Sequence, residues 1–184
     1  IMLSRDSYNG ASTGAQSVEF RKGTIDPVAY TLGQSISGAI TQPEDTIAYR
    51  FTLAEAKSLF FNVVGDRYNA VLKRLDGNDG TLFSNSLSSS DMHSLLRMDA
   101  GTCELRLSPN SRDLSSTLGT YNIQLQDVSA LPILTMDTPA VGATTQSRLS
   151  NEWRFDGIAG TRLLIDPRLT TGSNDQYIYW SLVD

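Results

Sequence analysis

The sequence contains one cysteine and one histidine in 184 residues, and no long apolar run. One cysteine permits no disulfide within the chain, and the apolar runs fall well short of the roughly 18 residues of a membrane span. The net charge is −5 and the pI is near 4.8. The few Lys and Arg residues form no cluster, which excludes the basic footprint that binds phosphates. We therefore expect no membrane span and no nucleic-acid partner.

The first ten residues, Ile1–Gly10, have neither the basic start nor the apolar stretch of a signal peptide. A chain that starts at Ile without those features is expected to be a fragment of a longer precursor.

What is present is a repeat. The segment Thr46–Val64 has a degenerate second copy at Leu149–Asp166, at an offset of 104 (153 minus 49). About 104 residues are enough to close a core, so each full repeat should fold as a domain. The aligned residues are Tyr49, Arg50 and Phe51 with Trp153, Arg154 and Phe155, and Leu59, Phe60 and Phe61 with Leu163, Leu164 and Ile165.

The repeat divides the chain into three parts. Residues 1–27 resemble the tail of a preceding repeat, since Leu3-Ser4 matches Leu107-Ser108. Residues 28–130 form a complete repeat, and residues 131–184 form the front half of a following one. Partial repeats leave unpaired strand edges, which invite pairing. We therefore expect neighbouring repeats, or self-association of this chain, as partners.

Apolar residues alternate with polar ones throughout the complete repeat, and turn residues separate the runs. About eight short strands at this spacing predict an all-β fold, an antiparallel β-sandwich of jelly-roll type. The predicted strands are Gln34–Ile40, Thr46–Leu53, Lys57–Val64, Tyr68–Leu75, Thr81–Phe83, Met92–Met98, Thr102–Leu107 and Thr120–Gln126.

The segment Thr52–Leu59 argues against an all-β fold, because it has a capping-box spacing and good helix formers. Its counterpart in the second copy carries Gly157 and Gly160, each of which costs about 1 kcal/mol in a helix. Since two copies of one fold share a structure, we predict a turn, or at most one helical turn.

The order of GQSISGAI, EDTIAYRF, KSLFFNVV, AVLKRLDGNDGTL, AGTCELRL and GTYNIQL resembles the bacterial pre-peptidase C-terminal domain. The family's usual Gly-Asp before the second strand is replaced by Glu44-Asp45 in this chain. Cys103 stands where the family has an aromatic residue. The resemblance implies a β-sandwich that is attached to secreted proteases or strung in tandem in adhesin-like surface proteins. Some relatives bind matrix or carbohydrate, and some bind calcium.

From this we expect a non-catalytic structural or adhesive repeat module, secreted or at a bacterial cell surface. The alternative is an accessory domain that holds a secreted hydrolase on its matrix or carbohydrate substrate. Many copies in a full-length precursor would favour the module, and a protease domain upstream would favour the accessory domain.

Asp76, Asn78 and Asp79 place hard oxygen ligands close together in a turn, which is what calcium binds. The alternative is a plain Asp-Gly hairpin. An EF-hand loop starting at Asp76 would need a glutamate at its twelfth position, where Leu87 stands. Calcium is the one cofactor that the sequence indicates, and none is required.

Tyr177, Tyr179 and Trp180 form an aromatic group in which alternate residues share a face of a strand. Such a group would serve as a platform on which a sugar stacks. The alternative is core packing, because the group lies at the counterpart of a core strand.

Catalytic chemistry has little support in the sequence. Cys103 alternates with Leu105 and Leu107, so we expect a buried thiol and not a nucleophile. His93 would act as a base toward a serine such as Ser90, but a polar histidine at a loop edge is the favoured interpretation. We expect no enzyme.

Overall fold

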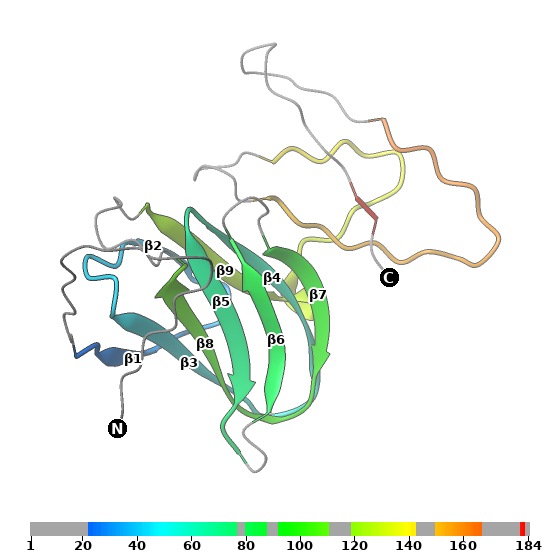
Figure 1. The fold of residues 1–184 in the computed structure, drawn as a ribbon. Coiled ribbons are helices and arrows are strands. Elements are labelled where there is room, and N and C mark those ends of the chain that lie inside the picture. The colour runs from blue at the N-terminus through cyan, green and yellow to red at the C-terminus, as the bar shows by residue number, and fades with distance from the viewer. Residues whose placement is uncertain are drawn as a thin grey trace, which may run out of the picture.

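The computed structural model describes residues 22–76, 80–87, 92–110, 119–142, 150–166 and 181–182. These residues form two facing sheets, with strand orders β1-β3-β8-β5-β6 and β2-β9-β4-β7 (Figure 1). The strands are β1 Ile25–Ala29, β2 Ser35–Gly38, β3 Thr46–Leu53, β4 Lys57–Gly65, β5 Tyr68–Arg74, β6 Thr81–Ser86, β7 Met92–Met98, β8 Gly101–Pro109 and β9 Tyr121–Asp127, followed by the 3₁₀ turn η1, Val128–Ala130. In the described part of the chain, no helix is long and apolar enough to cross a membrane.

The strands pair as a long hairpin rolled onto itself. Antiparallel ladders join β2 to β9, β3 to β8, β4 to β7, and β5 to β6. Further antiparallel ladders join β4 to β9 and β5 to β8, so strands β2 to β9 are all joined by antiparallel ladders. This is the jelly-roll arrangement of a sandwich, so the predicted fold class is confirmed.

Most predicted strand positions are also confirmed. The bounds of β3 and β7 are those predicted from alternation, and the other predicted strands differ by one to three residues at an end. The stretch between β3 and β4 is a short bend, with no helical residue from Ala54 to Ala56. The prediction of a turn in place of a helix is therefore confirmed.

β1 was not predicted. It pairs in parallel with β3, with Ala29 opposite Arg50, and it crosses the predicted boundary between residues 27 and 28. The chain just before it is also tied to the sandwich, because the backbone N–H and hydroxyl of Thr24 both donate to Asp45 Oδ1 at 2.8 Å. The complete sandwich therefore begins before residue 28, and one of its ladders is parallel.

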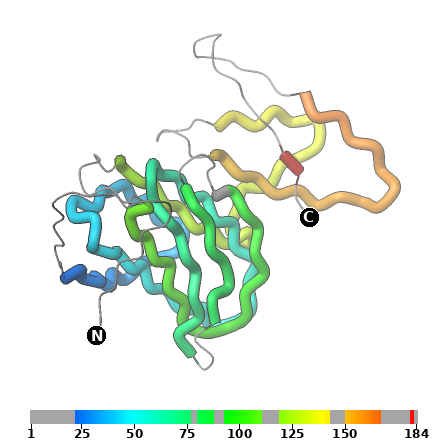
Figure 2. The backbone as a smooth tube through the Cα atoms, viewed as in Figure 1, coloured from blue at the N-terminus to red at the C-terminus, as the bar shows by residue number. Residues whose placement is uncertain are grey.

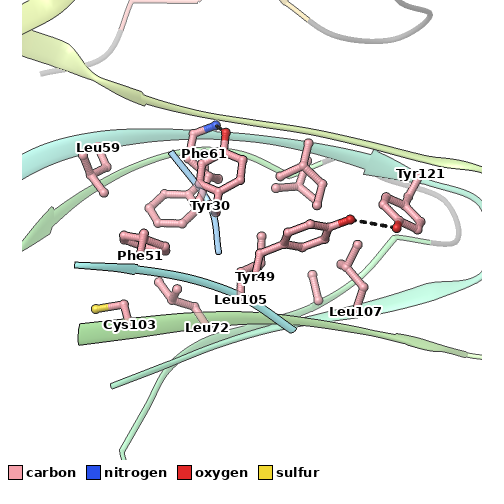
Figure 3. Packing of buried hydrophobic residues seen from close by; sticks show 14 of the residues in the cluster. Tyr30, Tyr49, Phe51, Leu59, Phe61, Leu72, Cys103, Leu105, Leu107 and Tyr121 are labelled. Carbon is pink, nitrogen blue, oxygen red and sulfur yellow. Dashed lines mark hydrogen bonds between the residues drawn. The ribbon is translucent and has the colours of Figure 1, made fainter. Parts of the chain in front are cut away.

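The core lies between the sheets and is rich in aromatic side chains (Figure 3). Phe51 and Phe61 are buried, as alternation predicts. The hydroxyls of Tyr49 and Tyr121 lie 2.8 Å apart inside the core, one donating to the other. Burial of polar oxygens costs free energy unless they are hydrogen-bonded, and this pair satisfies both.

Residues 131–142 and 150–166 lie outside the two sheets (Figure 2). They contain no strand, only a bridge between Ile133 and Arg154. The sequence predicts the front half of a second repeat for residues 131–184. Among the described residues of that stretch, this bridge is the part that corresponds to the first repeat.

Candidate interaction surface

The predicted calcium ligands are described only in part, since Asn78 and Asp79 lie outside the described residues. Arg74 binds both carboxylate oxygens of Asp76, with its Nε 2.8 Å from Oδ1 and its Nη2 3.3 Å from Oδ2. These hydrogen bonds hold the pKa of Asp76 below its usual range. Within the described ranges, no three His, Cys, Asp or Glu side chains gather into a metal-binding group. A cation at Asp76 would have to compete with Arg74, and the calcium site stays a prediction.

The aromatic platform predicted from Tyr177, Tyr179 and Trp180 lies outside the described residues as well. The predicted buried thiol is confirmed, because Cys103 is 1% exposed and burial raises its pKa. A thiol in that state is a poor nucleophile.

His93 is exposed on β7, and its Nδ1 lies 3.4 Å from the hydroxyl of Ser150. Ser90, the serine considered from the sequence, lies outside the described residues. The Ser150 hydroxyl donates to Glu152. In a catalytic triad the carboxylate binds the imidazole. Here the Glu152 carboxylate binds the serine hydroxyl.

Glu152 fastens its segment to the outer face of the sheet that contains β4 and β9. Its Oε1 accepts from Asn62 Nδ2 at 3.2 Å, and its Oε2 accepts from Gln126 Nε2 at 3.0 Å. Asn62 Nδ2 also donates to the carbonyl of Ser150 at 3.2 Å. Burial raises the pKa of Glu152, and the hydrogen bonds from the side chains of Ser150 and Gln126 oppose the shift only in part.

Just beyond this contact, the backbone repeats an arrangement of the first sandwich. Ile133 and Arg154 form a parallel bridge, and Leu134 N–H donates to the Arg154 carbonyl at 2.7 Å. In the sandwich, Ala29 pairs in parallel with Arg50, and Tyr30 N–H donates to the Arg50 carbonyl at 2.7 Å. Every one of these positions is related by the offset of 104 found in the sequence (133 minus 29; 154 minus 50).

The two arginines differ in what their side chains contact. Arg50 Nε donates to Glu104 Oε2 at 2.5 Å across the β3–β8 ladder. Arg154 Nε is shielded from solvent and has no hydrogen-bond partner among the described residues. Among the described residues, the one carboxylate contact of the Arg154 guanidinium is at Nη1, which lies 3.7 Å from Asp156 Oδ1.

Apolar side chains further along the segment that contains Arg154 are exposed. Leu164 and Ile165 are 93% and 57% exposed, whereas their counterparts Phe60 and Phe61 lie in β4, and Phe61 is fully buried. Ile158 is 81% exposed. We define the interaction surface as residues 151–158 and 163–165, which combine an unsatisfied buried donor with exposed apolar side chains.

Sequence reasoning missed the contact made by Glu152 and the ion pair made by Glu104. The signal for the first was Asn62, a polar residue inside the apolar run of β4. The signal for the second was Glu104, which alternates with Cys103 and Leu105 and so points to the outer face of its sheet. Neither signal names the partner, because both partners lie far away in the sequence.

A scan against family models and a search of curated proteins find no match. Among solved structures, the sandwich is similar to the pre-peptidase C-terminal domain of a Bacillus anthracis collagenase, with 16% identity and a TM-score of 0.46 over 59% of this chain and 100% of that chain. A periplasmic inhibitor of g-type lysozyme from Aeromonas hydrophila has 13% identity and a TM-score of 0.44, over 57% and 100% of the two chains. The Yersinia pseudotuberculosis-derived mitogen has 12% identity and a TM-score of 0.39, over 63% and 97%. All three identities are below 25%, and none of these likenesses carries a family or a function to this chain.

Proposed function

We propose that this chain is a non-catalytic structural and adhesive repeat module of a large bacterial secreted or surface protein, and that its repeats associate by strand pairing. The observation that carries the proposal is the second parallel bridge, Ile133 with Arg154, at an offset of 104 from Ala29 with Arg50. A sequence repeat and a backbone register that agree on one offset support a tandem array. Exposed strand edges in such an array favour pairing between units.

The interaction surface supports the associative part of the proposal. Soluble monomers seldom expose contiguous large apolar side chains unless the surface binds something. Here Leu164 and Ile158 are exposed in the same segment as Arg154, whose shielded Nε lacks a hydrogen-bond partner within the described ranges. The surface therefore offers both apolar area and a directional polar contact to a partner.

The second candidate function is an accessory domain that holds a secreted hydrolase on matrix or carbohydrate. The sequence resemblance to domains attached to secreted proteases favours it. In that case the aromatic group at Tyr177, Tyr179 and Trp180 would contact the ligand.

Sedimentation velocity of the full chain over a wide concentration range, together with binding to immobilised collagen and to an insoluble polysaccharide, separates the two functions. The repeat module predicts a mean sedimentation coefficient that rises with concentration in the absence of any ligand. The accessory domain predicts a monomer that binds one of the two supports saturably and loses that binding in a Tyr177→Ala/Trp180→Ala variant. A monomer that binds neither support would contradict both functions.

A further inference from the structure

The outer face of the sheet β1-β3-β8-β5-β6 carries a group of cations. In β3, β8 and β5, the residues that alternate with the buried core residues point to this outer face. They are Ala48, Arg50 and Thr52 on β3, Thr102, Glu104, Arg106 and Ser108 on β8, and Asn69, Val71 and Lys73 on β5. We call the three cations of this set, Arg50, Lys73 and Arg106, the basic face.

Strand register brings these cations together from distant parts of the chain, where they are 23 and 33 residues apart (73 minus 50; 106 minus 73). Glu104 lies opposite Arg50 on one side and opposite Lys73 on the other, and Arg106 is two residues further along β8. Diagonal neighbours of this kind lie about 7–8 Å apart. Three cations therefore surround one carboxylate, with a net charge of +2 (3 minus 1) in a chain whose net charge is −5.

Glu104 holds the two arginines in place. Arg50 Nε donates to Glu104 Oε2 at 2.5 Å, and Arg106 Nε donates to Glu104 Oε1. Among the described residues, the Nη groups of both arginines have no hydrogen-bond partner. The side chains of Arg50 and Arg106 remain 46% and 29% exposed. Two guanidinium groups are thus fixed on the sheet, and their terminal N–H groups are left for a ligand.

Lys73 adds a positive charge that is not neutralised locally. It is partly exposed, and in the part of the chain that the structure describes, its ammonium group has no carboxylate or hydrogen-bond partner. Other cations of the sandwich are paired, since Lys57 binds Asp127 and Arg74 binds Asp76. The basic face therefore attracts anions more strongly than those paired positions do.

We propose that the basic face binds a sulfated polysaccharide, with Arg50, Arg106 and Lys73 as the contacts to its sulfate groups. This inference goes beyond the proposed repeat module and does not depend on it. Charge complementarity selects an anionic ligand. The fork of a guanidinium matches two oxygens of one oxyanion, and an ammonium group binds a further oxyanion as a point charge.

The uncharged side chains of the same face favour a sugar chain over a protein or a nucleic acid. None of the described outward residues of β3, β8 and β5 is aromatic. Protein interfaces usually centre on aromatic or large apolar side chains, and single-stranded nucleic acids stack on aromatic ones. Thr102, Ser108 and Asn69 instead offer hydroxyl and amide groups, which donate to and accept from sugar hydroxyls.

The test is isothermal titration calorimetry of the full chain with a heparin-derived oligosaccharide at low ionic strength, where exposed charges are least screened. The comparison ligand is the same oligosaccharide after removal of its sulfates, which keeps the sugar chain and its carboxylates. We expect the desulfated ligand to bind at least about tenfold more weakly, because charge-assisted hydrogen bonds are lost. Equal binding of the two ligands, or no binding of the sulfated one, would overturn the proposal.

A variant at Lys73 locates the contact without disturbing Glu104. Lys73→Gln should leave the melting temperature unchanged and should weaken binding of the heparin oligosaccharide about three- to tenfold, with a shallower dependence of affinity on salt. Lys73→Arg should retain binding. Arg97→Gln is the matched control, because it removes one positive charge from an exposed position on β7 of the other sheet and should not change binding. Equal weakening by Lys73→Gln and Arg97→Gln would assign binding to net charge and overturn the basic face.

Two further ligands distinguish the classes of anionic partner. Polyglutamate and single-stranded DNA, each matched to the heparin oligosaccharide in charge, should bind more weakly than it does. Equal or tighter binding of polyglutamate would indicate an acidic protein partner, and the same result with the DNA would indicate a nucleic acid. Either result would show that the assignment to a sulfated polysaccharide is wrong.

Discussion

Arg50 and Glu104 face each other across the β3–β8 ladder, with Arg50 Nε 2.5 Å from Glu104 Oε2. Glu104 points to the outer face of its sheet and is nevertheless fully buried, since Arg50 and Arg106 both bind its carboxylate. Burial alone would raise the pKa of Glu104. The hydrogen bonds from the two arginines outweigh it, so the pKa lies below its ordinary value.

Glu104→Ala should therefore destabilise the sandwich by about 1–3 kcal/mol. Removing one partner of a buried ion pair costs about 3–5 kcal/mol, and we expect less because the Arg50 side chain is 46% exposed and water screens it. Urea unfolding of the variant measures the loss. Glu55→Ala is the control, since its exposed ion pair with Lys57 should contribute less than about 0.5 kcal/mol. Equal losses in both variants would contradict a special role for Glu104.

The same pair predicts how stability depends on pH. Because the folded-state pKa of Glu104 is depressed, its contribution is present above the ordinary pKa of 4.5 and is lost as the pH falls through the lower folded-state value. Unfolding curves between pH 2 and pH 7 should show this acid loss in the parent chain, and Glu104→Gln should reduce it.

Glu152 should give the opposite dependence. Burial raises its pKa, so its contact with the sandwich is strongest below the ordinary pKa of 4.5 and weakens as the pH rises through the raised value. Fluorescence of Trp153, one residue away, should report the change if Trp180 is first replaced by Phe. Glu152→Gln should keep the contact and remove its pH dependence. A pH dependence unchanged in Glu152→Gln would assign the effect to another group.

Phe61→Ala should destabilise the sandwich by about 3–5 kcal/mol, because it leaves a cavity in a core where Phe61 is fully buried. A loss of that size is enough to unfold a marginal domain. Thermal unfolding followed by circular dichroism at a β-sheet wavelength measures it. Leu82→Ala, at a position that is 49% exposed, should change the free energy of unfolding far less. Similar losses in the two variants would show that the core is not where the structure places it.

Calcium at millimolar concentration should raise the melting temperature, and a chelator should lower it again. A cation bound only by the folded chain stabilises it by mass action and relieves repulsion between Asp76 and Asp79. Asp79→Asn should abolish the rise, while Asp26→Asn, an exposed position on β1, should not. If calcium leaves the melting temperature of the parent chain unchanged, the turn is a plain hairpin, and Arg74 is the cation that Asp76 binds.

The sequence predicts those parts of the fold in which apolar and polar residues alternate along a strand. Tyr49, Phe51 and Leu53 share one face of β3 because only one face meets the core, so the period of two is visible along the chain. β1 gives no such signal. Its residues Ile25–Ala29 are exposed throughout and include Pro27, which removes a backbone donor and is tolerated there because β1 is an edge strand.

The interaction surface was beyond sequence reasoning for a different reason. The repeat aligns Arg154 with Arg50, but what distinguishes Arg154 is a contact that it lacks among the described residues. That difference is visible only by comparison with the contact that Arg50 makes. The partner in that contact, Glu104, is fixed by the register of β3 against β8. The register of strands that are far apart in the sequence depends on the whole fold. No pattern in the sequence near Arg50 or Glu104 therefore indicates that the two residues pair.

Deleting residues 1–21 should abolish self-association of the chain and leave the sandwich folded. The segment resembles the end of a repeat, so it would add strands to the partial repeat of another copy, and such head-to-tail contacts do not close and so grow. The structure sets the limit of the deletion, because Thr24 binds Asp45 and its carbonyl accepts from Thr46 N–H at 2.8 Å. Removing Thr24 as well would disturb the entry to β1 and β3. Light scattering at high concentration measures association, and the melting temperature of the shortened chain checks the sandwich. A parent chain that stays monomeric at high concentration, or a shortened chain that still associates, would show that the N-terminal segment is not the donor.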